Sequence, residues 1–323
     1  MNSSESLFDA HLANYLNSVS GKNPVELYEP ESYILSLGGK RVRPNLVLKA
    51  CQLFDVDISQ AMDAALCVEI FHNFSLIHDD ILDNAPLRRN KPTVHEKWNT
   101  NIAILSGDVM LVKAFDVLKS YDGEKFKQLY EVFSKTAIDV CEGQQYDMNF
   151  EKLDNVSVED YINMITNKTA VLLGCSLQMG AIVAGTSIEN QIHLYEFGKN
   201  IGIAFQLLDD YLDAFPIDST AFGKQIGGDI ISNKKTYLLL KALEMASESQ
   251  KNAIHLILKE QNPEQKVNDM LQIYKVLNLS EACKAEANRH TTIALDHLLK
   301  IKAKPEAINE LREFASSLLN RTH

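Results

Sequence analysis

Two groups of aspartates in the sequence share the spacing D-D-x-x-D, and each group ends a long apolar run. The six residues are Asp79, Asp80, Asp83, Asp209, Asp210 and Asp213. On a helix, the first and last acids of each group lie one turn apart on the same face, where like charges repel unless a cation lies between them. The spacing therefore predicts that each group binds a hard metal ion.

The repetition of the group separates the metal hypothesis from a structural one. A single acidic cluster, such as the one that Pro86 follows, is equally typical of a solvated helix end. If two such helices face one another, six carboxylates surround one space, and that charge is unstable without divalent cations. Oxygen ligands, with neither His nor Cys within the D-D-x-x-D pattern, favour Mg²⁺ over zinc or copper.

Cations follow both acidic groups and also an early Gly-Gly turn. Mg²⁺ that is bound by a few carboxylates completes its shell with water and phosphate oxygens, and apolar helices below the acids suit a hydrocarbon tail on a diphosphate. We expect Gly38, Gly39 and Pro44 to hold the intervening cations in place for a phosphate, the alternative being a solvated surface run. The cations assigned to phosphate binding are Lys40, Arg43, Arg88, Arg89, Lys168, Lys224 and Lys234.

Lys168 stands out because its neighbours are apolar. A buried ammonium without a partner costs free energy, so the sequence predicts an anionic partner for it. The alternative is a lysine whose stem is buried while its charge reaches water.

The elements that must position these residues are all helical. Apolar residues recur at helical spacing, broken by Gly and Pro, without sustained β alternation. The predicted helical ranges are 5–19, 27–37, 45–83 as two helices, 102–118, 125–149, 156–185, 190–215 and, as several helices, 236–320. No linker or low-complexity segment divides them, so we expect one all-α domain over residues 1–323.

Composition limits the class of protein and its compartment. A formal net charge of -11 argues against binding of nucleic acid or an anionic membrane by the whole surface, so a phosphate site must be local. The N-terminus has no signal-peptide pattern, and no apolar run approaches the roughly 18 residues of a membrane span. Five widely spaced cysteines without a CxxC pair predict reduced thiols. We therefore expect a cytoplasmic protein with no integral membrane segment.

With these motifs in place, the sequence resembles the trans-type (head-to-tail) isoprenyl diphosphate synthases, the polyprenyl synthetase family, and in particular its short-chain farnesyl and geranylgeranyl members. The matching pieces, in family order, are GGKRVRP (38–44), HNFSLIHDDILD (72–83), RRNKPTVH (88–95), GQQYD (143–147), NKT (167–169), FQLLDDYLD (205–213) and GKQIGGD (223–229). One departure is Asn90, where the family commonly has Gly; it bears on the backbone of the loop more than on its charges.

The resemblance implies a role for each matching residue. Three Mg²⁺ ions would be held by Asp79, Asp83 and Asp209, with Asp80, Asp210 and Asp213 as further ligands or supporting partners. The allylic diphosphate would be gripped by these ions and by Arg88, Lys168, Lys224 and Lys234. Isopentenyl diphosphate would bind Lys40, Arg43, His72 and Arg89. Thr169 and Gln206 would lie against the reacting carbons.

The resemblance also implies the fold and the reaction. The fold would be a bundle of long, mostly antiparallel helices around a deep central cavity, typically a homodimer, with range 102–118 as a candidate interface. The allylic C–O bond would break as its diphosphate is neutralised, and the double bond of isopentenyl diphosphate would attack the resulting cation. The lost proton would pass to the departing diphosphate. His78, beside Asp79, is more typical of a packed histidine than of a general base.

The helix that ends in the first acidic group can also limit the chain length of the product. One helical turn rises about 5.4 Å, close to one isoprene unit. Ser75 lies one turn below Asp79 and is small, whereas Phe71 and Phe74 could form the floor deeper down. Within the family this pattern resembles enzymes that form the C20 product, geranylgeranyl diphosphate, more than those that form the C15 product, farnesyl diphosphate.

Three alternatives differ from a C20 synthase. A farnesyl diphosphate synthase differs only in product length. A terpene cyclase needs no pocket for a second substrate, so Lys40, Arg43, Arg89 and the second D-D-x-x-D argue against it. A non-catalytic regulatory subunit should have lost motif acids or cations, and this sequence retains them.

Overall fold

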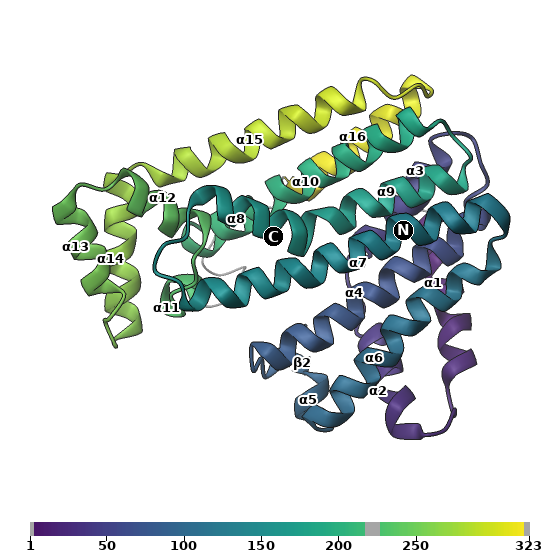
Figure 1. Cartoon of the computed structure of the whole chain (residues 1–323), viewed down its shortest axis with the longest axis horizontal. Helices are drawn as coiled ribbons and strands as arrows, with labels where there is room; N and C mark the ends of the chain where they lie inside the picture. The colour runs from purple at the N-terminus through teal and green to yellow at the C-terminus, as the bar shows by residue number, and fades with distance from the viewer. Residues whose placement is uncertain (1–2, 217–226, 320–323) are drawn as a thin grey trace. The chain divides into compact units, whose positions relative to one another are not determined.

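The computed structural model of the chain describes residues 3–216 and 227–319, which are helical along nearly their whole length (Figure 1). The prediction of an all-α fold is confirmed. The chain divides into two compact units, Met1–Ser134 with Ser176–Ile192 and Lys135–Cys175 with His193–His323. The expectation of one domain around a deep central cavity stays a prediction.

The first unit is built around the helix that carries the first acidic group. Its elements are α1 (Ser3–Val19), α2 (Val25–Ser36), α3 (Val42–Gln52), the 3₁₀ turn η1 (Ile58–Ala61), α4 (Met62–Leu82), β1 (Leu87–Arg88), β2 (Lys91–Pro92), α5 (Val94–Lys97), α6 (Thr100–Asp116) and the 3₁₀ turn η2 (Val117–Ser120). Helix α4 packs against α3 and α6, and α2 covers α6 (Figure 1). Nearly all of the side chains of α4 up to Phe74 are buried, so this helix forms the core of the unit.

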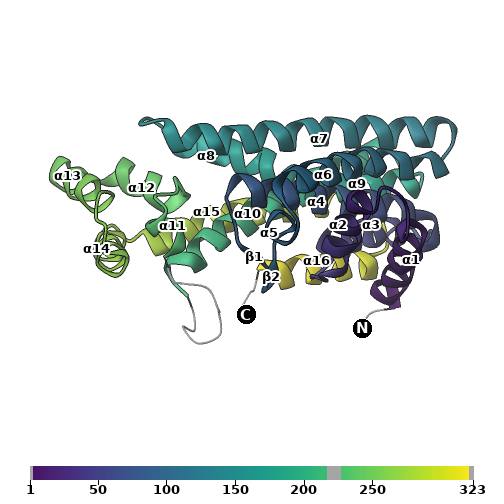
Figure 2. The same ribbon diagram turned by 90° about the horizontal axis from the view of Figure 1, so that it is seen from below.

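The second unit holds the other acidic group. Its elements are α8 (Val158–Ile165), the π-helical turn η3 (Thr166–Ala170), α11 (Gly228–Ile231), α12 (Tyr237–Met245), α13 (Glu248–Ile257), α14 (Pro263–Val276), α15 (Leu279–Leu298) and α16 (Pro305–Leu319). The long helices α7 (Gly123–Lys152), α9 (Val171–Val183) and α10 (Ile188–Ala214) contribute residues to both units. Helix α12 packs against α8, α14 and α15, and Figure 2 shows α12, α13 and α14 grouped together.

A short hairpin, which the sequence did not predict, follows α4. Strands β1 and β2 pair antiparallel with Arg88 opposite Lys91, so Arg89 and Asn90 form a two-residue turn. Both have left-handed backbone angles, with φ of 52° and 61°. Two-residue hairpins favour this conformation, and asparagine tolerates it better than most residues. Asn90 therefore supplies the backbone geometry for which glycine is the usual residue.

The range 156–185, predicted as one helix, is interrupted by a π-helical turn at Thr166–Ala170. Two other helices come very close to this turn at glycines. A Cβ at Gly143 would lie 2.2 Å from the backbone nitrogen of Lys168, and a Cβ at Gly202 would lie 2.6 Å from the Cα of Ala170. Neighbouring helices can come this near only where they present glycine. Single π turns often occur at functional sites.

Among the described residues, no helix is both long and apolar enough to cross a lipid bilayer.

Candidate active site

The first acidic group lies at the end of α4, and its three carboxylates have different surroundings. Asp80 is 1% exposed and accepts hydrogen bonds from Arg88, from Nε at 2.8 and 3.0 Å and from Nη2 at 2.7 Å. A planar guanidinium matches a carboxylate in this two-pronged geometry. Nη1 of Arg88 takes no part in these bonds. Asp80 therefore anchors the hairpin that carries Arg88 to the end of the helix.

Asp79 is half-buried and Asp83 is exposed, one turn apart. His78 faces α6, where its Nε2 lies 3.3 Å from the Ile104 carbonyl oxygen. A Cβ at Gly107 would lie 2.4 Å from that nitrogen, so α6 needs glycine there to admit the ring. The contacts of His78 are those of a packed histidine, as the sequence indicated.

Arg43 and His72 contact each other directly. The Nη1 of Arg43 donates to the Nε2 of His72 at 3.1 Å. Burial, together with the positive charges of Arg43 and Arg89, holds the pKa of His72 well below its usual value. His72 is therefore neutral at physiological pH, which the acceptor role requires. Burial also lowers the pKa of Arg43 to about 10, still high enough to keep its charge.

Arg89 reaches the Gly-Gly turn that carries the other predicted cations. Its Nη1 donates to the Gly38 carbonyl oxygen, and a Cβ at Gly39 would lie 2.8 Å from its Nη2. Lys40, two residues further along the chain, is exposed. Three of the four residues predicted to bind isopentenyl diphosphate, Arg43, His72 and Arg89, thus lie around one turn.

Arg41 has a different task from its neighbours. Its backbone is left-handed, with a φ of 44°, and its side chain turns inward. There it donates to the buried Glu69 and to the Leu35 carbonyl oxygen at 2.7 Å. Asn73 donates to the same carboxylate at 3.0 Å. Glu69 therefore fixes the loop that carries Lys40 and leads into α3, whose first turn carries Arg43.

A cluster of aromatic rings in tilted and edge-to-face contact includes two residues of α4 that precede the first acidic group. Phe74 is 6% exposed and Phe71 is fully buried. Their ring centroids are 5.4 Å apart, and Phe71 also meets Phe133 of α7 at 5.3 Å. The ring of Phe115 in α6 also contacts Phe133, with ring centroids 4.7 Å apart. Ser75 is only partly buried, and its hydroxyl donates to the His72 carbonyl oxygen at 2.8 Å.

The second acidic group, on α10, also has one buried member. Asp210 is 5% exposed and accepts a hydrogen bond from the Tyr161 hydroxyl. The Gln206 amide and the Tyr237 backbone N–H also donate to it, each at 3.3 Å. Burial is the main reason why the pKa of Asp210 rises to about 7. Asp80 and Asp210 are thus the buried members of their groups, and each accepts hydrogen bonds from the protein.

Asp213 connects α10 to the start of α11. Its side chain accepts from the Asp229 backbone N–H at 3.1 Å, and its carbonyl oxygen accepts from the Gly227 N–H at 2.8 Å. Lys224 lies outside the described residues. Lys234 is exposed, and its backbone N–H donates to the Asp229 carbonyl oxygen at 2.9 Å.

The π-helical turn carries Lys168 and Thr169. The ammonium of Lys168 lies 2.6 Å from an oxygen of Asp147, which is the anionic partner that the sequence predicted without identifying. Thr169 donates to the Gln206 amide oxygen at 3.4 Å. The second unit therefore brings three predicted site residues, Lys168, Thr169 and Gln206, to the neighbourhood of one π turn.

The two acidic groups supply oxygen donors, the kind of ligand that Mg²⁺ prefers. In the described part of the chain, no three His, Cys, Asp or Glu side chains converge on one point. Mg²⁺ at phosphate sites needs only one or two carboxylates, since water and phosphate oxygens complete its shell. Apart from its buried member, each group offers two acids one turn apart. These pairs, Asp79 with Asp83 and Asp209 with Asp213, fit the ion.

Sequence reasoning missed three supporting residues: Glu69, Asp147 and Tyr161. Asp147 lies within the quoted motif GQQYD, so its position was a usable signal. Glu69 had a weaker signal, since it is an acid inside an apolar helix and must be paired. Tyr161 is 49 residues from Asp210, and no sequence spacing indicates their contact.

Comparisons with known proteins agree with one another. The family profile described as polyprenyl synthetase matches residues 24–277. A short chain isoprenyl diphosphate synthase from Methanothermobacter thermautotrophicus is 36% identical, covering 95% of this chain and 94% of that relative. A geranylgeranyl diphosphate synthase from Saccharolobus solfataricus is 37% identical, with 89% of each chain covered. Among solved structures, a geranylgeranyl pyrophosphate synthase is 44% identical and has a TM-score of 0.90, with 100% of both chains covered.

Proposed function

Because the chain belongs to the polyprenyl synthetase family, as its motifs indicated, we propose that it is a prenyltransferase that makes geranylgeranyl diphosphate. It condenses isopentenyl diphosphate with dimethylallyl, geranyl or farnesyl diphosphate. Relatives named geranylgeranyl diphosphate synthase support the C20 product. Farnesyl diphosphate is the second candidate product, because Phe74, the nearest ring of the proposed floor, lies only roughly 1.4 turns before Asp79 on the same helix.

The observation that carries a two-substrate reaction is the cationic cluster around Gly38 and Gly39. Arg43 pairs with a neutral His72, and Arg89 bonds to the same turn. These groups suit a second diphosphate, for which a terpene cyclase has no use. They are not the groups that surround the acids of α4, where Arg88 is bound to Asp80.

The allylic diphosphate is proposed to bind at the two acidic groups. When bound there, Mg²⁺ neutralises the leaving diphosphate. The proposed ligands are Asp79, Asp83, Asp209 and Asp213, with Asp80 and Asp210 in support and three ions per site. The proposed cationic partners of the diphosphate are Arg88, Lys168, Lys224 and Lys234.

The chain's own groups then act on the carbons. The role proposed for the Thr169 hydroxyl and the Gln206 amide oxygen, which are hydrogen-bonded at 3.4 Å, is to stabilise with their dipoles the positive charge on the allylic carbon. Once the allylic C–O bond has broken, the double bond of isopentenyl diphosphate attacks the allylic cation and forms the new C–C bond. The proton lost from the product passes to the departing diphosphate, so no nucleophilic side chain is required.

The proposal is tested by supplying Mg²⁺ and isopentenyl diphosphate with each allylic diphosphate and sizing the products. We expect C20 from all three primers. Failure to elongate farnesyl diphosphate would exclude the C20 product, and C15 as the longest product would establish the second candidate. If none of the three primers is elongated, the result would support a non-catalytic subunit instead.

We also propose that the protein is a homodimer. Helix α6 exposes three large apolar side chains, Ile104, Leu105 and Val112, with exposed fractions of 40, 59 and 65%. Leu105 and Val112 are seven residues apart and share a face of the helix. An apolar face of this kind suits a second copy of the chain.

The proposed compartment is the cytoplasm. All five cysteines lie in the described part of the chain, and none is in a disulfide. Reduced thiols are typical of a reducing compartment. Oxidative labelling of the protein in cell fractions would test this assignment.

A further inference from the structure

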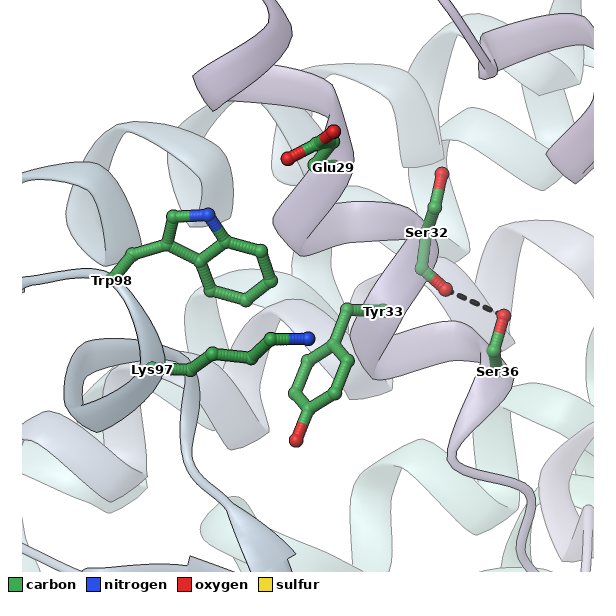
Figure 3. A pocket seen from close by; sticks show the side chains of 6 residues that line it. All are labelled: Glu29, Ser32, Tyr33, Ser36, Lys97 and Trp98. Atoms are coloured by element: carbon green, nitrogen blue, oxygen red, sulfur yellow. Dashed lines mark hydrogen bonds between the residues drawn. The ribbon is translucent and has the colours of Figure 1, made fainter.

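A group of three side chains joins α2 to the segment that follows the hairpin. The Tyr33 hydroxyl donates to the Pro92 carbonyl oxygen at 2.8 Å. The rings of Tyr33 and Trp98 meet edge to face at 5.4 Å, and the Lys97 ammonium lies 3.8 Å from the Tyr33 ring centroid and 4.6 Å from that of Trp98 (Figure 3). We call Tyr33, Lys97 and Trp98 the aromatic clasp.

The aromatic clasp connects two segments that lead to residues of the proposed isopentenyl diphosphate pocket. Helix α2 ends at Ser36, just before the Gly38–Gly39 turn. Pro92 ends β2, three residues after Arg89. These segments are 59 residues apart at the Tyr33–Pro92 contact. The hydrogen bond from Arg89 to Gly38 joins the same two segments a second time.

Within the aromatic clasp, Tyr33 is the residue that connects α2 directly to β2 of the hairpin. A cavity of about 520 Å³ opens beside the clasp and is lined by Glu29, Ser32 and Ser36 of α2 as well as by the clasp itself (Figure 3). Ser36 donates to the Ser32 carbonyl oxygen, within its own helix. The face of α2 that lines the cavity is therefore open to water around Tyr33, and Tyr33 reaches across to Pro92.

We infer that Tyr33 is a positioning residue for isopentenyl diphosphate: its hydroxyl and ring hold the hairpin to α2 and so keep Arg89 at the Gly38–Gly39 turn. The inference rests on the proposed function. Arg88 has a separate anchor in Asp80, so the opposite strand of the hairpin is held from the other side. Loss of the Tyr33 hydroxyl should therefore disturb Arg89 more than Arg88.

The test is Tyr33→Phe, which removes one hydroxyl and keeps the ring. We expect the KM for isopentenyl diphosphate to rise about 3- to 10-fold, the effect of one lost hydrogen bond. The kcat and the KM for the allylic substrate should stay within about twofold. Tyr121→Phe is the matched control, because the Tyr121 hydroxyl also donates to a backbone carbonyl, that of Gln60 at 2.7 Å, away from both cationic segments. It should leave both KM values unchanged.

Hydrogen exchange of the substrate-free protein provides a readout that does not depend on activity. In Tyr33→Phe, amides of residues 87–93 should exchange faster than in the wild type, and in Tyr121→Phe they should not. Unchanged exchange, or an equal rise in both KM values, would overturn the inference. A wild-type protein that does not use isopentenyl diphosphate would instead overturn the proposed function, and the exchange result would still decide the positioning role.

Discussion

Asp80 and Asp210 occupy the same place in their acidic groups, yet the protein compensates their burial differently. Asp80 faces a guanidinium at 2.7 Å, which offsets the loss of water with a full opposite charge. Asp210 has a tyrosine hydroxyl, an amide and a backbone N–H instead. Neutral donors compensate a buried carboxylate less completely, which is consistent with a pKa of about 7 for Asp210.

The salt bridge between Lys168 and Asp147 gives a prediction at the same scale. Asp147→Asn removes the charge that holds the ammonium, and we expect kcat/KM for the allylic substrate to fall about 2- to 5-fold, in keeping with a partly exposed pair. Steady-state kinetics measures the change. Asp139→Asn is the control, since it breaks the Lys135–Asp139 bridge on the same helix and should leave kcat/KM unchanged. Equal effects of the two variants would contradict the role given to Asp147.

His72 predicts how stability depends on pH. Its folded pKa lies below the usual value of about 6.5, so the unfolded chain binds more protons between those two values. This histidine therefore lowers stability as the pH falls below about 6.5. Glutamine can still accept the Arg43 hydrogen bond and does not titrate, so His72→Gln should lose less stability between pH 7.5 and 5.5 than the wild type. Urea unfolding at both pH values measures the difference.

The control for that prediction is His255→Gln, because His255 is exposed on α13. It should keep the full pH dependence of the wild type. If His72→Gln and the wild type lose the same stability on acidification, His72 is not buried as a neutral acceptor.

Helix α4 carries both the first acidic group and two aromatic residues of the proposed floor. Its last turn presents the acids, and its buried aromatic residues lie one to two turns below them. The rings of Phe71, Phe74, Phe133 and Phe115 come from α4, α6 and α7, so the proposed floor would depend on all three helices. Because helical turns rise about 5.4 Å, each turn of open space corresponds to roughly one more isoprene unit.

We expect product length to depend on these aromatic residues. Phe74→Ala should open space below Ser75 and lengthen the product by at least one isoprene unit, and Phe71→Ala should do the same deeper down. Product sizing by chromatography measures both. Phe126→Ala, at a ring 37% exposed on α7, should not change the product. Unchanged length in both α4 variants would place the floor elsewhere.

The β1–β2 hairpin allows a test of the departure from the family pattern at Asn90. Asn90 has a φ of 61°, which glycine adopts freely and a β-branched residue does not. Asn90→Gly should leave activity unchanged and stability within about 0.5 kcal/mol, whereas Asn90→Val should destabilise by about 1–2 kcal/mol. Thermal unfolding compares the two. A valine variant as stable as the glycine variant would rule out a left-handed turn at this position.

At the scale of the whole molecule, the proposed homodimer depends on the exposed face of α6. Leu105→Glu places a charge at a side chain that is 59% exposed, and we expect the dimer to dissociate at least tenfold more readily, as buried unpaired charges do in interfaces. Sedimentation equilibrium measures the association. Leu256→Glu, on the 71% exposed Leu256 of α13, is the control and should stay dimeric. A wild-type monomer would contradict the proposal at once.

The sequence by itself determined the helical class, the family and the positions of the two acidic groups. Each of these depends on local information: apolar residues at helical spacing, glycine and proline at breaks, and short motifs in a characteristic order. Even the outcome at Asn90 followed this rule, because left-handed turns select residue types directly. Most predicted helix ends lie within a few residues of the observed ones for the same reason.

Only the tertiary structure decided which acid of each group is buried, which residue pairs with Lys168, and that His72 is neutral. These properties depend on burial and on partners from distant segments, such as Tyr161 for Asp210 and Arg43 for His72. The π turn under Lys168 had the same origin, because it coincides with glycines 143 and 202 on two other helices. Residue types and local spacing do not specify such long-range contacts, since packing of several elements creates them.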